Sequence, residues 1–512
     1  MALYDLLVIG GGINGLGIAA DAAARGLSVC IVEKGDWGGG TTSASSRLIH
    51  GGLRYLQHGE IDLVRESLKE RGTIVRQRPH LVHPISLLIP AYKTAPLPKW
   101  MVGVGLGMYH VLARDPLFPA PAPVSFADAR KREPGLNPDG LTGGFTYPDA
   151  QMEFPERFCV ELVQETVAAG GTVRSSTQVV ELLAENKRVT GAILCDDLTG
   201  ETSELRASVT INAAGPWVDV VSRLLPEAAR PPRMMGGTWG THLVLPVRPD
   251  TASPTGAIYA NARKDGRPFF LLPWDDRLLV GTTDVKYTGD NPDTLEVEPW
   301  EIEYLLAETN HLFPGANYVP GDVQTTTCGV RPLPASDKNA GAVTRRHFLV
   351  DHGAKHGVHG LASVVGGKLT TYRSLAEEVT DWVLRTLGKT PVLCSTGYVP
   401  PDVPTVATLH SATAQTLRRL GLPVSLATGL VKRYGAASAD ILARVERDPT
   451  SGTFVAPNTP CIEAQVVHAA KSEFARTVSD IVRRRLMLFP PTAEAIAGVR
   501  RVVQERGLRL DG

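Results

Sequence analysis

Residues 5–33, DLLVIGGGINGLGIAADAAARGLSVCIVE, decide the fold of this chain. The apolar run Leu6–Ile9 is typical of a buried parallel strand, and a second such run follows at Leu27–Val32. Between them, residues 13–25 have the composition of a helix, which Gly26 ends. A strand, a helix and a second strand in this order predict a βαβ unit and a Rossmann-like α/β domain.

Three glycines in the pattern G-x-G-x-x-G connect the first strand to the helix: Gly10, Gly12 and Gly15. The first permits a tight turn, the second lets a pyrophosphate approach the backbone, and the third lets the helix pack close to the strand. The helix N-terminus offers its N–H groups and dipole to phosphates. Glu33, which ends the second strand, can accept hydrogen bonds from an adenosine ribose. The unit therefore predicts a dinucleotide site, with NAD and FAD both open.

Length and composition narrow the class of protein. A chain of 512 residues suffices for two or three domains. Lys+Arg and Asp+Glu both number 53, so no net charge attracts nucleic acid, and we expect no such partner. Six cysteines without a CxxC pair argue against a metal site or disulfides and for a reducing compartment. Because no secretory signal is visible, we expect a cytoplasmic protein.

The longest apolar segment, Trp100–Ala113 (WMVGVGLGMYHVLA), is too short to cross a bilayer. We expect a buried helix here. The alternative is a helix lying in the membrane interface, with Trp100 and the nearby Lys93 and Lys99 at headgroup level. That alternative would place the protein peripherally on the inner face of the cell membrane.

Similar signals return in Ser208–Trp217, an apolar strand that breaks into a tight turn, and in Leu361–Thr370, a strand followed by a glycine pair, and they indicate a nucleotide-binding domain assembled from separated stretches. The insertions between them contain strand patterns that predict an antiparallel sheet roofing the cofactor. A proline-rich linker after 388 precedes helical patterns, among them a helix over Cys461–Val478. The expected divisions are 1–80, 156–235 and 329–388 for the nucleotide-binding domain, 81–155 and 236–328 for the substrate domain, and 389–512 for a C-terminal α-helical domain.

The segment after Glu33, residues 38–55, is GGGTTSASSRLIHGGLRY. Its glycines and hydroxyl residues suit a backbone that wraps closely around a polar ligand. Taken singly, His50 is as well explained by a structural role as by a catalytic one, and Arg54 by a surface ion pair. Their clustering with Tyr55 beside the nucleotide loop favours function. The expected cofactor contacts here are Thr42, Ser45 and Ser46.

Two downstream segments carry cationic residues in constrained settings. In TCGVRPL, Arg331 stands beside a proline and can present its fork to a carboxylate or phosphate. In GGKLTTYR, the glycines are expected to open a helix whose N-terminus faces a flavin, with Lys368 in its first turn adding positive charge. Lysine there opposes the helix dipole, so it indicates a nearby anion. Further expected cofactor contacts are Gly215, Gly366, Gly367, Lys368 and Thr370.

With these residues in view, the sequence closely resembles the FAD-dependent (aerobic, respiratory-type) glycerol-3-phosphate dehydrogenases over essentially its whole length. The core SSRLIHGGLRYL is highly specific, whereas many flavin and nicotinamide enzymes share the glycine pattern. The segment Trp37–Gly40 is richer in glycine than is usual for the family. The matching segments are DLLVIGGGINGLGIAADAAARGLSV, TTSASSRLIHGGLRYLQHGE, NAAGPWV, PWDDRLLVGTTD, CGVRPL and GGKLTTYR.

The resemblance implies a D-amino-acid-oxidase-like flavoprotein fold with an added C-terminal helical domain. Gly10, Gly12, Gly15 and Glu33 would then hold the ADP portion of FAD. The resemblance also places a set of residues around the flavin and substrate. Arg345 would be a phosphate ligand, and the others are Arg54, Arg331, Lys368, His50 and Tyr55.

The implied reaction is oxidation of sn-glycerol 3-phosphate to dihydroxyacetone phosphate by hydride transfer to FAD, with electrons passed to a quinone. His50 is the first candidate for the base, because imidazole titrates near neutral pH. Alternatively, Arg331 polarises the hydroxyl and water takes the proton. Open alternatives are an oxidase using O₂, an amine or amino-acid oxidase of the same fold, and a non-catalytic nucleotide-binding protein. Peripheral membrane contact and a homodimer also stay open.

Overall fold

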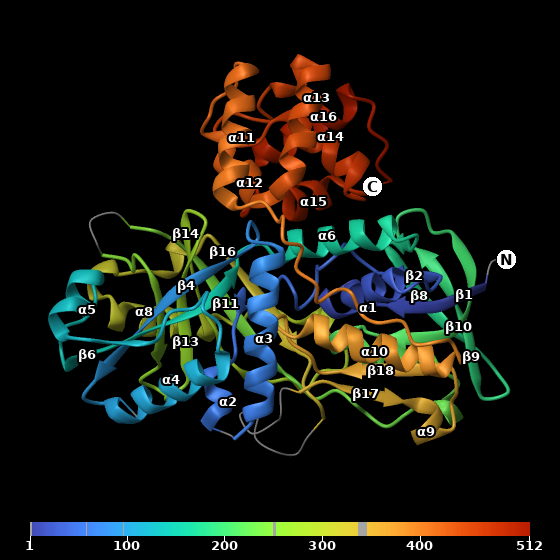
Figure 1. Ribbon diagram of the computed structural model, residues 1–512, viewed down its shortest axis with the longest axis horizontal. Coiled ribbons are helices and arrows are strands. Elements are labelled where there is room, and N and C mark those ends of the chain that lie inside the picture. Colours follow the sequence, from blue (N-terminus) through green and yellow to red (C-terminus); the bar gives the residue numbers. More distant parts are fainter. Residues whose placement is uncertain (1–2, 58, 96, 249–251, 336–345, 512) are drawn as a thin grey trace.

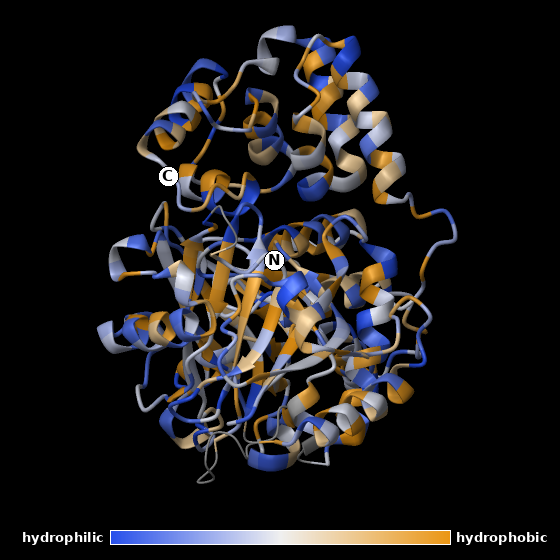
Figure 2. Cartoon of the chain, turned by 90° about the vertical axis from the view of Figure 1, so that its left-hand side faces the viewer, coloured by the Kyte–Doolittle hydropathy of each residue, from blue (hydrophilic) through white to orange (hydrophobic). Residues whose placement is uncertain are grey.

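The computed structural model describes residues 3–57, 59–95, 97–248, 252–335 and 346–511. Two sheets occupy the two halves of the main body in Figure 1, and the helices of the C-terminal part of the chain lie above them. The sheet that contains the N-terminal strand is in the right half of that view. Hydrophobic residues are concentrated in the strands that cross the middle of the body (Figure 2).

The first sheet is built around β1 (Leu3–Ile9), which pairs in parallel with β2 (Val29–Val32) and β10 (Thr202–Asn212). Residues 6–8 of β1 are fully buried, as expected for a strand covered on both faces. The other strands are β7 (Thr172–Arg174), β8 (Thr177–Glu185), β9 (Arg188–Asp196), β17 (Phe348–Asp351) and β18 (Leu361–Val365). The order β17-β18-β10-β1-β2-β7, with β9 also pairing β10 and β8 pairing β9, confirms the expected α/β class.

Helix α1 (Ile13–Ala24) packs between α6 (Pro155–Ala168) and α10 (Tyr372–Thr386). Its close approach to β1 depends on glycine. A Cβ on Gly15 would lie 1.9 Å from the carbonyl oxygen of Gly10. Gly10 itself has a φ of +111°, a conformation that favours glycine. The spacing of this motif is therefore imposed by backbone contact between the turn and the helix.

The second sheet takes its strands from separated stretches of the chain. Its described pairings are antiparallel, except for the parallel pair formed by β4 (Val82–Tyr92) and β12 (Ala257–Asn261). The expected antiparallel roof is thus a mixed sheet, because this parallel pair joins the strands of the two insertions. The other strands are β3 (Leu48–Ile49), β5 (Ala122–Val124), β6 (Leu141–Met152), β11 (Thr238–Pro246), β13 (Pro268–Trp274), β14 (Arg277–Gly281), β15 (Val285–Lys286) and β16 (Thr325–Arg331).

Two of these strands lie across the expected domain divisions. β3 belongs to the second sheet although residues 1–80 were assigned to the nucleotide-binding domain, and β16 spans the division at 328/329. Both strands lead from one sheet to the other beside the cavity described below. The helices associated with this half are α2 (Leu53–Gln57), α3 (Ile61–Gln77), α4 (Lys99–Ala113), α5 (Phe126–Arg132) and α8 (Pro299–Leu312).

The expectation of a buried helix at 100–113 is wrong. The segment is helical, as α4, but only Leu106 and Tyr109 of it are buried. Apolar side chains instead line an exposed stripe one helical face wide. The stripe comprises Trp100, Met101, Val104, Met108 and Val111. Among the described residues, no helix has the length and apolarity needed to span a membrane.

The C-terminal helices form their own core around residues such as Leu417, Leu430 and Ile441. In place of one helix over 461–478, the structure has a shorter helix, and Phe474 beyond its end has a φ of +56°, which is incompatible with a continuing helix. The described helices here are α11 (Val406–Arg419), α12 (Leu426–Tyr434), α13 (Ser438–Arg447), α14 (Glu463–Ser472), α15 (Val478–Asp480), a π-helical turn (Ile481–Arg485) and α16 (Ala493–Glu505).

A buried ion pair docks this domain on α6. Arg157 donates to both carboxylate oxygens of Glu473, at 2.8 and 2.6 Å, and also to the carbonyl oxygen of Arg433. Burial opposes ionisation of Glu473, but Arg157 and His468 lower its pKa to about 2. The pair is therefore ionised at neutral pH within a buried interface.

We predict that Glu473→Gln lowers the free energy of unfolding by about 3–5 kcal/mol, because it leaves the buried Arg157 charge uncompensated. Urea unfolding followed by circular dichroism measures this. Glu185→Gln is the matched control, since Glu185 pairs with Arg206 at the surface, and we expect a change of at most about 1 kcal/mol. Equal, small changes in both variants would contradict the assigned role of the buried pair.

Candidate active site

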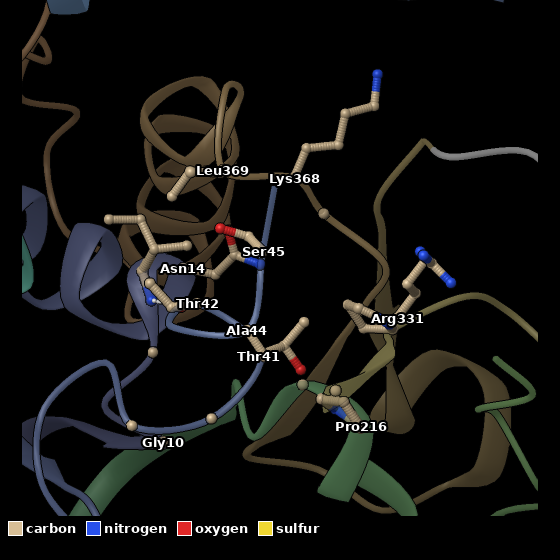
Figure 3. Close-up of a pocket in the computed structure, with 18 of the residues that line it drawn as sticks. Gly10, Asn14, Thr41, Thr42, Ala44, Ser45, Pro216, Arg331, Lys368 and Leu369 are labelled. Carbon is tan, nitrogen blue, oxygen red and sulfur yellow. Dashed lines mark hydrogen bonds between the residues drawn. The ribbon is translucent and has the colours of Figure 1, made fainter. Parts of the chain in front are cut away.

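One cavity of about 800 Å³ lies where the glycine turn, the segment 39–55 and the second sheet meet. Its size suits a dinucleotide with a small ligand beside it. Figure 3 shows the segment with Thr41, Ala44 and Ser45 between the glycine turn and Arg331, with Lys368 at the top of the view. The carboxyl ends of β1 and β10 open into it, the usual ligand position in parallel sheets.

The glycine turn has the features of a phosphate cradle. The backbone N–H of Ile13, at the start of α1, donates to Oγ1 of Thr42 at 3.2 Å, which fixes the segment over the turn. Oδ1 of Asn14 is buried without a hydrogen-bond partner in the described structure. A Cβ on Gly367 would lie 2.4 Å from Nδ2 of the same residue. Glycines thus keep this turn open around a polar atom that lacks a partner in the described part of the protein, and its role in holding the ADP portion of FAD stays a prediction.

Glu33 follows β2, and its carboxylate points toward the glycine turn. It accepts hydrogen bonds from the backbone N–H groups of Gly11, at 2.6 Å, and Gly35, at 2.8 Å. Burial raises the pKa of this carboxyl group against the effect of those bonds. Glu33 lines the cavity, so its remaining lone pairs are available to ribose hydroxyls. Its role as a ribose ligand stays a prediction.

His50 faces the cavity, and its backbone is held from both sides by one side chain. Oγ1 of Thr370 accepts from the His50 N–H at 3.1 Å and donates to its carbonyl oxygen at 3.2 Å. Burial lowers the pKa of His50; Asp149 opposes this, and the charges of Lys368 and Arg71 add to it. The imidazole is therefore neutral at physiological pH and competent to accept a proton.

Lys368 lies in a loop rather than in a helix. The expectation that the Gly366–Gly367 pair opens a helix is wrong, because α10 begins only at Tyr372. Both glycines have positive φ, and a Cβ on Gly366 would lie 2.8 Å from the carbonyl oxygen of Arg346, which explains the turn. Nζ of Lys368 stands 4.0 Å from the ring centroid of Tyr55. The cation is held over this ring at the cavity wall.

Arg331 ends β16 and is held rigidly by the second sheet. Its guanidinium donates to the carbonyl oxygens of Trp239 and Thr283, at 2.9 and 2.8 Å, and to Oδ1 of Asp284, at 3.0 Å. Asp284 also pairs with Arg267, so two arginines share one carboxylate at the cavity wall. The two arginines and the one carboxylate together leave a net positive charge at this wall of the cavity.

Of the other predicted site residues, some line the cavity, and the side chains of two fall outside the described structure. Gly215 begins a 3₁₀ turn (Gly215–Trp217) after β10 and lines the cavity together with Ser45 and Ser46. Arg54 lies within α2, and its side chain falls outside the described part of the structure. Arg345 lies outside the described residues.

His242 is a cavity residue that the sequence interpretation missed. It is buried on β11, and its Nε2 lies 2.8 Å from Oγ of Ser46. Burial and the charges of Arg331 and Arg47 lower its pKa to about 3, and its Nδ1 has no partner in the described structure. A histidine in the strand sequence THLVLP carries no local signal of such a role, because only strand pairing brings it to the cavity.

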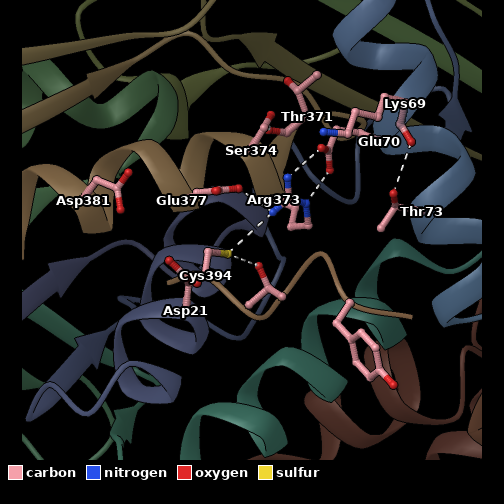
Figure 4. A network of polar contacts seen from close by, with 12 residues as sticks. Asp21, Lys69, Glu70, Thr73, Thr371, Arg373, Ser374, Glu377, Asp381 and Cys394 are labelled. Carbon is pink, nitrogen blue, oxygen red and sulfur yellow. Dashed lines mark hydrogen bonds and ion pairs between the residues drawn. The ribbon is translucent and has the colours of Figure 1, made fainter. Parts of the chain in front are cut away.

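A second layer of charges holds the loop of Lys368 in place (Figure 4). Arg373, in the first turn of α10, pairs with Glu70 of α3 through two bonds of 2.7 Å and with Glu377 at 2.8 Å. Oγ of Ser67, on the same helix α3, lies 3.4 Å from Nζ of Lys368. Helix α3 thus fixes both the lysine and the helix that follows it.

Comparison with known proteins agrees with this geometry. The FAD-dependent oxidoreductase family model matches residues 5–373. The model of the C-terminal domain of alpha-glycerophosphate oxidase matches residues 402–506.

Relatives and solved structures extend the match to the whole chain. A glycerol-3-phosphate dehydrogenase of Synechocystis sp. is 40% identical over 97% of this chain and 91% of its own. An aerobic glycerol-3-phosphate dehydrogenase of Staphylococcus haemolyticus is 32% identical over 94% and 86%. The crystal structure of glycerol-3-phosphate dehydrogenase from Bacillus halodurans, complexed with FAD, superposes with a TM-score of 0.78 at 25% identity, covering 99% and 91%. This chain belongs to the FAD-dependent glycerol-3-phosphate dehydrogenase family.

Proposed function

We propose that the protein oxidises sn-glycerol 3-phosphate at C2 to dihydroxyacetone phosphate, with FAD as cofactor. The observation that carries the proposal is one cavity in which a flavin cradle adjoins a neutral histidine, His50, and the cations Arg331 and Lys368. The names of the relatives described above support the same substrate. An amine or amino-acid oxidase would need cationic groups for one carboxylate only, so the surplus of positive charge favours a phosphorylated alcohol.

Bound FAD supplies the hydride acceptor. The protein has two tasks, to fix the substrate and to move a proton. Arg331 and Lys368 neutralise the phosphate dianion and orient the C2–H bond, since orientation supplies much of the rate. His50 takes the C2 hydroxyl proton as the hydride leaves C2, which yields the ketone. His242 stays neutral and holds Ser46 at the cavity wall.

We expect anaerobic addition of glycerol 3-phosphate to the purified holoprotein to bleach its visible flavin absorbance. Arg331→Ala should keep its FAD but lower the rate of bleaching by about 100- to 1,000-fold, because a preorganised charge is lost. Stopped-flow absorbance measures both. Absence of bleaching in the unchanged protein would reject the substrate, and bleaching at the normal rate in Arg331→Ala would reject the role of this residue.

The pH dependence of kcat tests His50 as the base. Burial lowers the pKa of His50 below 6.5, so its neutral form persists at neutral pH and is lost only as the pH falls through that lowered pKa. We expect an acid limb below pH 6.5 that is absent in His50→Asn, with kcat about 100- to 10,000-fold lower. His83→Asn, on β4 outside the cavity lining, is the control. An unchanged acid limb in His50→Asn would assign the proton to another group.

For the electron acceptor we propose a quinone, reached at the inner face of the cytoplasmic membrane. The apolar stripe of α4 supports this, since Trp100, Val104 and Val111 are each more than half exposed. Helix α4 is also tied to the cavity wall, because Oη of Tyr109 accepts from the N–H of Gly51, the neighbour of His50. A helix lying on the membrane would thus hold the flavin site close to the lipid.

We predict that Val104→Ser/Val111→Ser lowers binding to anionic phospholipid vesicles about tenfold or more, because two side chains lose their burial in the interface. Leu393→Ser is the matched control, as Leu393 is 93% exposed in the linker before α11. Vesicle cosedimentation measures binding, and reoxidation by a quinone analogue or by O₂, each offered alone, identifies the acceptor. Equal vesicle binding by all three proteins would reject the docking face, and faster reoxidation by O₂ would favour an oxidase.

A further inference from the structure

The segment after Glu33 forms a lid on the glycine turn. Trp37 is fully buried, and a Cβ on Gly11 would lie 2.6 Å from its ring. The N–H of Gly38 donates to the carbonyl oxygen of Gly11 at 2.9 Å. The position of residues 36–42 therefore sets the position of the backbone that faces the cofactor phosphates.

Asp36, at the start of this segment, is held from the C-terminal domain. Arg485 donates to both of its carboxylate oxygens, at 2.7 and 2.8 Å, and Nε of Arg484 donates to Oδ2. The side chains of Arg485 and Asp36 are 0% and 1% exposed. Burial opposes ionisation, but the two arginines hold the pKa of Asp36 below its usual value. Separating a buried pair of this kind would leave an uncompensated buried charge, so the pair holds both partners in place.

Three consecutive arginines in the π-helical turn have three different environments. Arg483 is exposed, Arg485 is buried on Asp36, and Arg484 lines the cofactor cavity. Nη2 of Arg484 lies 3.2 Å from Asp480, which orients the guanidinium. Its Nη1 lies 4.0 Å from the point where a Cβ on Gly39 would be and makes no hydrogen bond to the part of the chain that the structure describes. π-helical turns occur frequently at functional sites.

From this geometry we propose that the C-terminal domain forms part of the FAD site. Arg484 contributes Nη1 as a ligand to the diphosphate of the ADP portion, while Arg485 acts through Asp36 as a positioning residue for the segment over the glycine turn. A guanidinium donor suits a diphosphate because it combines charge with directed hydrogen bonds. The C-terminal domain thereby acquires a role in cofactor retention.

Thermodynamic linkage predicts that FAD binding and docking of the C-terminal domain strengthen each other. If docking of the C-terminal domain strengthens FAD binding, FAD must strengthen docking by the same factor. The chain between α10 and α11 (residues 387–405) is largely exposed, and Gln77 of the main body donates hydrogen bonds to the carbonyl oxygens of Thr396 and Tyr398 in it. Loss of the cofactor therefore loosens the C-terminal domain, and proteolysis of the linker reports it.

The first experiment measures the dissociation constant of FAD for the apoprotein by flavin fluorescence. We expect Arg484→Ala to weaken FAD binding about tenfold or more, as for a lost hydrogen bond to a charged group. Arg483→Ala, the exposed neighbour, should bind FAD as the unchanged protein does, and Arg484→Lys should recover part of the loss. ADP alone should show the same ranking, because it carries the diphosphate without the flavin. Equal affinity of Arg484→Ala and Arg483→Ala for FAD would overturn the assignment of the ligand.

The second experiment measures cleavage of the linker by a protease with and without FAD. We expect FAD to slow cleavage of the unchanged protein and of Arg483→Ala, and to slow it several-fold less in Arg484→Ala and Asp36→Asn. Identical protection by FAD in all four proteins would overturn the coupling. Both readouts are independent of glycerol 3-phosphate, so failure of the substrate proposal leaves them valid. Melting temperatures of the apoproteins verify that each variant is folded.

Discussion

The structure depends on one contact, the approach of the α1 backbone to the turn that precedes it. Only a residue without a side chain fits at Gly15, since a Cβ there would lie 1.9 Å from the Gly10 carbonyl oxygen. That contact brings the N-terminus of α1 to the carboxyl end of β1, where Gly12, Ile13 and Asn14 line the cavity. The cofactor cradle, the segment that covers it and the loop of Lys368 are all placed relative to this turn.

Around the turn, charges from distant parts of the chain are held by partners of opposite sign. Arg331 shares Asp284 with Arg267, Arg373 fixes α10 on α3 through Glu70, and Asp36 ties the cofactor loop to the C-terminal domain. Burying such a pair costs desolvation energy, and the attraction between the charges offsets this cost only while both partners stay in place. The pairs therefore favour one arrangement of the elements. The site is thus positioned by ionic contacts between elements, whereas the hydrophobic core supplies the bulk of the stability.

The sequence was sufficient to predict those parts of the site that are formed by residues close together in the chain. The turn at Gly10–Gly15, the strand before it and the cluster from His50 to Tyr55 follow from spacing and residue type. His242 and Arg484 carried no such signal, because a histidine in a strand and one of three arginines in a row are ordinary surface or core residues until the chain is folded. The apolar segment at 100–113 was misjudged for the same reason, since periodicity cannot tell whether another element covers a helix.

The sequence by itself determined the nucleotide unit, the fold class and the family, because backbone constraints on glycine and motif spacing act within a few residues. Tertiary structure alone decided which side chains share the cavity, that Lys368 lies in a loop ahead of α10, and that the C-terminal domain reaches the cofactor segment through Asp36. Contacts such as those of Asp36 with Arg484 and Arg485 join residues 448 and 449 positions apart. Their formation depends on strand pairing and on buried charges finding partners, which no local pattern records.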